Sequence, residues 1–125
     1  MENISYSNFK KMKVWQKSSE LAIIMYEICE SYPSIEKKRL ADQTLRSTSS
    51  IMANIAEGCG VGYLKKEISH LYNALGSANE SLSWIELAYK LKYINQDTYS
   101  ELTFLFEEVI KMLHGLIKSK NKQLT

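Results

Sequence analysis

The scarcity of residues that break helices is what most limits how this chain can fold. One proline and five glycines occur among its 125 residues. Sandwiches, barrels and α/β units contain many turns, and turns are rich in glycine and proline. So few breakers predict a small number of long helices instead. A chain of this length suits one hydrophobic core, and we expect a single domain over residues 1–125.

Apolar residues recur at helical spacing in four segments. They predict helices over about residues 9–32, 35–59, 64–91 and 96–118. Pro33 separates the first two helices, and three glycines within residues 58–62 separate the next two. Asn95 is placed to cap the fourth helix. In the third segment the apolar steps alternate between four and three, which is typical of a bundle seam.

Four helices with short connections predict one fold class. It is all-α, an antiparallel up-down-up-down four-helix bundle. We expect its core over residues 9–118 and a polar tail at residues 119–125 that frays.

The sequence shows no export or membrane signal. The longest apolar run, residues 21–26, is far shorter than a membrane span of about 20 residues or a signal-peptide core of about 7 to 15. We therefore expect a cytoplasmic protein with no membrane partner.

Little in the sequence favours catalysis or metal binding. Glu67 and His70 form one Glu-x-x-His pair, whereas a di-iron site in a bundle needs two such pairs and two further glutamates. The other histidine, His114, has no glutamate at that spacing. Cys29 and Cys59 are isolated and lack the spacing of metal ligands. We expect no catalytic residue, no metal and no cofactor, and a protein that is not an enzyme.

Basic side chains are clustered, although the net charge is only +2. Clusters of Lys and Arg bind phosphate backbones and release counterions. The alternative is a solvated helix surface that is balanced by nearby carboxylates. Two clusters lie at predicted helix starts and supply the candidate RNA contacts, which are Lys37, Lys38, Arg39, Lys65 and Lys66. Further clusters open the first predicted helix and close the fourth.

A stripe of polar side chains runs along the second predicted helix. Its members follow each other in steps of three and four and are Gln43, Arg46, Ser50, Asn54 and Glu57. Ser and Asn are poor helix formers, so propensity does not explain them. The stripe is either a buried polar network that fixes the register of helices or subunits, or a surface for a ligand or RNA.

The third and fourth predicted helices carry more small and apolar side chains than an isolated bundle needs. The additional positions are Ser77, Ser81, Trp84, Ala88, Leu91, Leu105 and Met112. Such wide stripes indicate deep burial or a subunit interface, and we favour self-association.

Several short motifs are similar to those of a known family. Leu40, Gln43 and Arg46, followed by Ser-Ile-Met-Ala-Asn-Ile-Ala-Glu-Gly at residues 50–58, form the most specific one. Residues 14–16, 76–80 and 91–94 add weaker ones. Together they resemble the four-helix-bundle proteins encoded in bacterial 23S rRNA intervening sequences, sometimes labelled S23 ribosomal proteins. The resemblance covers about residues 9–118.

The resemblance implies a left-handed antiparallel bundle that assembles as a homopentamer. It also implies kinship with the accessory variability determinant proteins of diversity-generating retroelements, which are basic pentamers that bind RNA and reverse transcriptase. We therefore expect a homo-oligomer that binds structured RNA, such as rRNA, or a ribonucleoprotein. The alternative function is a protein-binding scaffold without RNA affinity.

Overall fold

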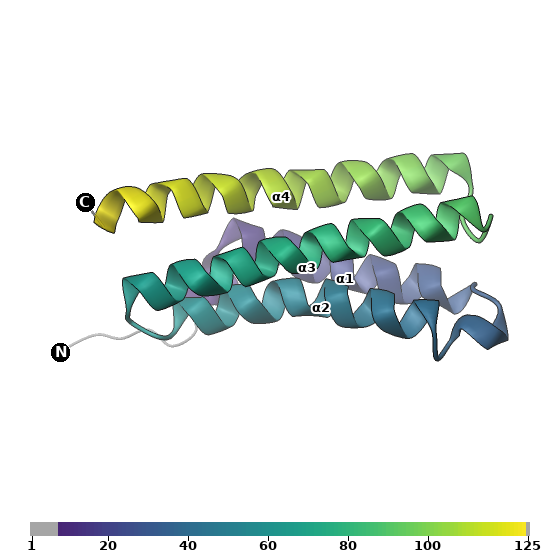
Figure 1. Ribbon diagram of the computed structural model, residues 1–125, viewed down its shortest axis with the longest axis horizontal. Helices are drawn as coiled ribbons and strands as arrows, with labels where there is room; N and C mark the ends of the chain where they lie inside the picture. Colours follow the sequence, from purple (N-terminus) through teal and green to yellow (C-terminus); the bar gives the residue numbers. More distant parts are fainter. Residues whose placement is uncertain (1–7, 125) are drawn as a thin grey trace.

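The computed structural model describes residues 8–124, which form four long helices and two short 3-10 turns (Figure 1). In chain order the elements are η1 (Asn8–Lys11), α1 (Lys13–Glu30), η2 (Ser34–Glu36), α2 (Leu40–Cys59), α3 (Leu64–Lys90) and α4 (Gln96–Leu124). These residues contain no strand, so the predicted all-α class is confirmed. Residues 1–7 and 125, which belong to the predicted domain and tail, lie outside the described residues.

The helices pack as an antiparallel up-down-up-down bundle, as predicted. α1 contacts α2 and α4, and α3 contacts the same two helices from the other side. The start of α1, the end of α2, the start of α3 and the end of α4 therefore lie together, at the left of Figure 1. The α1–α2 and α3–α4 turns lie at the opposite end.

All four helices supply the core at helical spacing. The largest side chains with almost no exposed surface include Met25 of α1, Ile51 of α2, Ile85 of α3 and Phe106 of α4. The other faces are mostly polar but carry exposed apolar side chains, among them Ile23 and Phe104. Within residues 8–124 no helix combines the length and the apolar character that crossing a membrane requires.

The predicted start of the second helix is wrong, because α2 begins at Leu40 and not at residue 35. The intervening residues form the turn η2, and the side chain of Glu36 explains why the helix starts later. Its Oε1 accepts a hydrogen bond from the backbone N–H of Leu40 at 3.5 Å. Its Oε2 accepts one from the Tyr93 hydroxyl at 2.7 Å. Glu36 thus ties the start of α2 to the α3–α4 turn.

The predicted end of the fourth helix is also wrong, since α4 continues past Lys118 to Leu124. A contact distant in sequence accounts for the extension. Lys120 Nζ lies 3.1 Å from Glu67 Oε2, and both side chains are largely buried, so the last turns of α4 are held against the first turn of α3.

Backbone hydrogen bonds close the turn between α3 and α4. The backbone N–H of Lys92 donates to the carbonyl of Tyr89, and that of Tyr93 donates to the carbonyl of Ala88, both at 2.9 Å. Lys92 has a φ of 65°, so these bonds form a Schellman cap with lysine at the position where glycine is usual. Asn95 Oδ1 then accepts from the backbone N–H of Thr98 at 2.8 Å, which confirms Asn95 as the cap of α4.

Candidate nucleic-acid interface

The two ends of the bundle carry opposite charge. We divide the described residues at the middle of each helix and define the basic end as residues 8–20, 50–75 and 110–124. It holds ten lysines and three glutamates, a formal charge of +7. The acidic end, residues 21–49 and 76–109, holds six Lys or Arg and ten Asp or Glu, a formal charge of −4. The small net charge therefore conceals a polarity along the bundle axis.

Lys65 and Lys66 lie at the basic end, in the first turn of α3, and both side chains are exposed. The loop before them turns at Gly62, whose φ of 65° suits glycine. The ion pair between Lys120 and Glu67 brings the last turns of α4 close to them. The lysines of α4 that share this end were visible in the sequence as a cluster, but only the antiparallel packing joins them to those of α3.

The cluster Lys37, Lys38 and Arg39 lies at the acidic end, between η2 and α2. It does not meet Lys65 and Lys66, so the five predicted contacts do not form one surface. Lys37 has a structural role, because its Nζ donates to the backbone carbonyls of Cys29 at 3.0 Å and Glu30 at 2.7 Å. A cation is favourable at these last carbonyls of α1, where the helix dipole is negative.

The predicted polar stripe of α2 divides between the surface and the contact with α3. Gln43, Arg46 and Glu57 are exposed, and Arg46 Nε pairs with Asp42 Oδ2 at 3.2 Å. Ser50 and Asn54 are half-buried. Asn54 Nδ2 donates to the carbonyl of Ser50 at 2.9 Å and to its hydroxyl at 3.1 Å. The stripe therefore does not act as one unit.

On α2 the fully buried hydroxyl groups are those of Thr44, Ser47 and Thr48, and all three lie outside the predicted polar stripe. Ser47 Oγ lies 2.8 Å and Thr48 Oγ1 lies 3.2 Å from Ser81 Oγ of α3. Ser81 donates to the carbonyl of Ser77, whose own hydroxyl donates to Ser50 at 3.0 Å. These hydroxyls form a ladder between α2 and α3. Of the two roles that the sequence left open for Ser77 and Ser81, burial and a subunit interface, these hydrogen bonds within one chain favour the first.

The same contact continues toward the basic end at His70. Its Nδ1 lies 3.3 Å from Asn54 Oδ1 and 3.7 Å from Glu57 Oε1. A Cβ on Gly58 would approach the Cβ of His70 to 2.9 Å, so the two helix backbones come close only because residue 58 is glycine. Asn54 and Gly58 of the predicted signature motif therefore have clear packing roles.

Nothing in the described residues favours nucleophilic or metal chemistry. Burial raises the pKa of the Cys29 thiol to about 11. Burial, followed by the carboxylate of Glu67, raises the pKa of Cys59. Both thiols are thus protonated near neutral pH, whereas the thiolate is the reactive form. Within residues 8–124 no group of three His, Cys, Asp or Glu side chains is placed to hold a metal ion.

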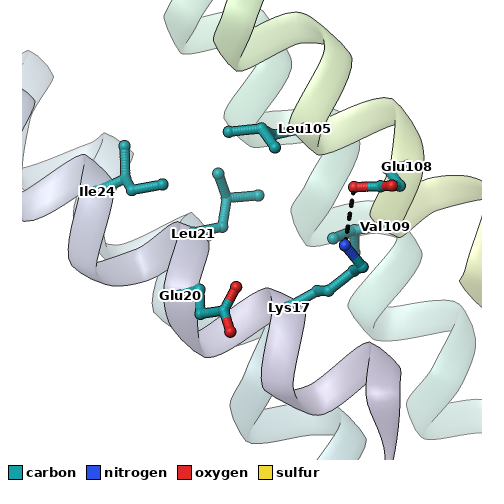
Figure 2. Close-up of a pocket in the computed structure, with 7 residues that line it drawn as sticks. All are labelled: Lys17, Glu20, Leu21, Ile24, Leu105, Glu108 and Val109. Carbon is teal, nitrogen blue, oxygen red and sulfur yellow. Dashed lines mark hydrogen bonds and ion pairs between the residues drawn. The ribbon is translucent and has the colours of Figure 1, made fainter.

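An apolar groove follows the contact between α1 and α4. Figure 2 shows Leu21 and Leu105 pointing into it from the two helices. The pair between Lys17 Nζ and Glu108 Oε1, at 3.2 Å, joins the two helices beside it. Nearer the basic end, a second depression of the same face is lined by Met12, Val14, Met112 and Leu116. We refer to these two depressions together as the α1–α4 face.

A second apolar surface lies on the opposite side of the bundle. Its apolar lining comes from Trp84 and Leu87 of α3, from Leu91 directly after α3 and from Leu40 of α2, and its polar rim from Glu36, Arg39 and Gln43. Leu87 is 40% and Leu91 is 46% exposed, which is high for leucine side chains. We call this surface the α2–α3 face.

Comparison with known proteins assigns the chain to a family. The model of the 23S rRNA-intervening sequence protein family matches residues 10–115. No curated protein matches the sequence. A crystal structure of a protein with unknown function from the S23 ribosomal protein family of Bacteroides thetaiotaomicron superposes with a TM-score of 0.79 at 32% identity, over 84% of this chain and 95% of that chain. The chain therefore belongs to the 23S rRNA-intervening sequence protein family.

Proposed function

We propose that this protein is a non-enzymatic homo-oligomer, a pentamer, that binds structured RNA through its basic end. The observation that carries the proposal is the separation of charge along the bundle, with +7 at one end and −4 at the other. A polyanion is attracted to the first end and repelled by the second, so the polarity also sets the orientation of binding.

The family name makes 23S rRNA the first RNA to test. The kinship with accessory variability determinant proteins stays a prediction. It also points to RNA as the ligand. Lys65 and Lys66 remain candidate phosphate contacts. Lys37, Lys38 and Arg39 are weaker candidates, because they lie at the acidic end and Lys37 is bound to carbonyls of α1.

Self-association is supported by the two apolar faces. The α1–α4 face and the α2–α3 face lie on opposite sides of the bundle, because each pair of helices forms one side of it. Two different surfaces that meet each other make a heterologous contact, which generates a ring when the rotation closes. A pentamer is such a ring, and it would place five basic ends around one axis.

The test compares two double variants that remove the same charge from opposite ends. Lys65→Ala with Lys66→Ala acts at the basic end, and Lys90→Ala with Lys92→Ala, two exposed lysines that are not candidate contacts, acts at the acidic end. Filter binding of a 23S rRNA fragment is measured over a series of salt concentrations. We expect the first variant to bind more weakly and to lower the slope of log K against log salt by roughly 1 to 2, because two phosphate contacts are lost. The second variant should match the unmodified protein.

Two other outcomes would contradict the proposal. Equal losses for both variants would contradict a binding site at the basic end. No detectable binding of the unmodified protein at low salt would favour the alternative, a protein-binding scaffold without RNA affinity.

A further inference from the structure

One groove at the basic end combines an aromatic ring, cations and an amide. It lies between α3 and α4, near the start of α3 and the end of α4, at the left of Figure 1. Its lining residues are Tyr72, His114, Ile117, Lys118, Asn121 and Lys122. Ile117 is buried and forms an apolar floor, whereas the polar side chains stand at the rim.

Tyr72 differs from four tyrosines of the acidic end, which pack against one another in pairs. Tyr89 and Tyr99 stack with ring centroids 4.1 Å apart, and Tyr32 packs against Tyr93 at 5.6 Å. Tyr72 is 52% exposed, and within residues 8–124 its side chain makes no ring contact or hydrogen bond. An exposed ring in a groove offers a flat surface on which another planar group can stack.

Lysines lie on both sides of this ring. Lys118 borders it from α4. Lys65 precedes Tyr72 by seven residues, or two helical turns, so it lies on the same exposed face of α3. Asn121 adds an amide that can both donate to and accept from the edge of a base.

We propose that this groove holds an unpaired nucleotide of the bound RNA, with its base stacked on Tyr72 and the adjoining phosphates at Lys118 and Lys65. The proposal rests on the RNA binding proposed above and adds the class of ligand. A paired base inside a duplex cannot reach the ring, whereas bases in loops and bulges are free to stack on aromatic side chains. The protein therefore selects RNA that contains unpaired bases.

The experiment uses two RNAs of equal length, a hairpin with an unpaired loop and a fully paired duplex, each titrated at several salt concentrations. The unmodified protein should bind the hairpin more tightly. Tyr72→Ala should weaken hairpin binding by roughly 5- to 150-fold at every salt concentration, since stacking of a base releases no counterion. Lys118→Ala should instead lower the salt slope by roughly 0.7 to 0.9, the value for one phosphate.

Two further variants separate stacking from other effects. Tyr72→Phe keeps the ring and should bind as the unmodified protein does. Tyr26→Ala removes a ring that is 57% exposed on α1 at the acidic end, and it should have no effect. Circular dichroism establishes that each variant is folded.

Failure of this inference is distinguishable from failure of RNA binding itself. Equal binding of hairpin and duplex, with no loss in Tyr72→Ala, would overturn the nucleotide site and leave the basic end as a general phosphate surface. A loss in Tyr72→Phe as large as that in Tyr72→Ala would overturn stacking. Absence of binding to both RNAs at low salt would overturn the proposed function, and the nucleotide site with it.

Discussion

Gly58 controls how closely α2 and α3 approach each other. A Cβ at this position would lie 2.9 Å from the Cβ of His70 and 3.2 Å from the carbonyl oxygen of Glu67. Neither atom is the end of a flexible side chain, so the helices must separate to admit it. Gly58→Ala should lower the free energy of unfolding by about 1 to 3 kcal/mol, as overpacking does. Urea denaturation measures the change.

The same substitution at Gly76 is the matched control. Gly76 is exposed in the middle of α3, and a Cβ there would meet nothing within 4 Å. Gly76→Ala should raise the free energy of unfolding by about 0.5 to 1 kcal/mol, because alanine favours the helix. If both substitutions changed the free energy of unfolding in the same direction, the close approach of α2 and α3 would not be what requires glycine at position 58.

Single residues of the signature motif are thus explained by packing. Gly58 admits the approach of α3, and Asn54 joins Ser50 of its own helix to His70 of the facing one. The motif could be recognised from the sequence, but its role could not. Which hydroxyls and amides meet depends on the relative rotation of two helices, and the spacing within one helix does not report it.

At the scale of elements, the sequence predicted correctly those features that depend on residues close together in the chain. The four helices, the break at Pro33 and the cap at Asn95 follow from spacing and capping chemistry within a few residues. The predicted starts of α1 and α2 and the predicted end of α4 were wrong. Partners distant in sequence set the last two. Tyr93 fixes Glu36, and Glu67 fixes Lys120.

The candidate site also has a part that the sequence could identify and a part that only the fold could. Lys65 and Lys66 could be identified from the sequence as an exposed cluster. Lys37 looked equivalent, and only the fold shows that it caps α1. The groove around Tyr72 could not be predicted, because it depends on the register of α3 against α4.

Truncation tests the extended end of α4. A chain that ends at Ser119 loses Lys120, and Glu67 is left largely buried without that cation. We expect the free energy of unfolding to fall by about 1 kcal/mol, because an unpaired, partly buried carboxylate is costly. A chain that ends at Lys122 keeps the pair and should be as stable as the full chain. Equal stability of both truncated chains in thermal denaturation would mean that the last turns of α4 contribute nothing.

At the scale of the whole molecule, charge and apolar surface are arranged differently. Charge changes along the bundle axis, whereas the two apolar faces lie on opposite sides of it, the α1–α4 face from the middle to the basic end and the α2–α3 face at the acidic end. A ring closed through the two faces would leave the ends open, so assembly and RNA binding need not compete for one surface. Five copies of a +7 end would produce the strong field that one chain with a net charge of +2 lacks.

A mixing experiment tests the heterologous contact. Met112→Glu alters the α1–α4 face, and Leu87→Glu with Leu91→Glu alters the α2–α3 face. Each variant alone should be a monomer of about 14.4 kDa by light scattering, since every contact needs both faces. Ile23→Glu, at a position 62% exposed but outside both faces, should remain an oligomer.

Mixing the two monomeric variants restores one intact contact, because each contributes the face that the other lacks. The mixture should therefore show a species of twice the monomer mass and nothing larger, since the remaining two faces are both altered. An isologous contact, in which one face meets its own copy, predicts the opposite: the variant altered in the other face would dimerise alone, and mixing would add nothing. A monomeric unmodified protein would refute self-association altogether.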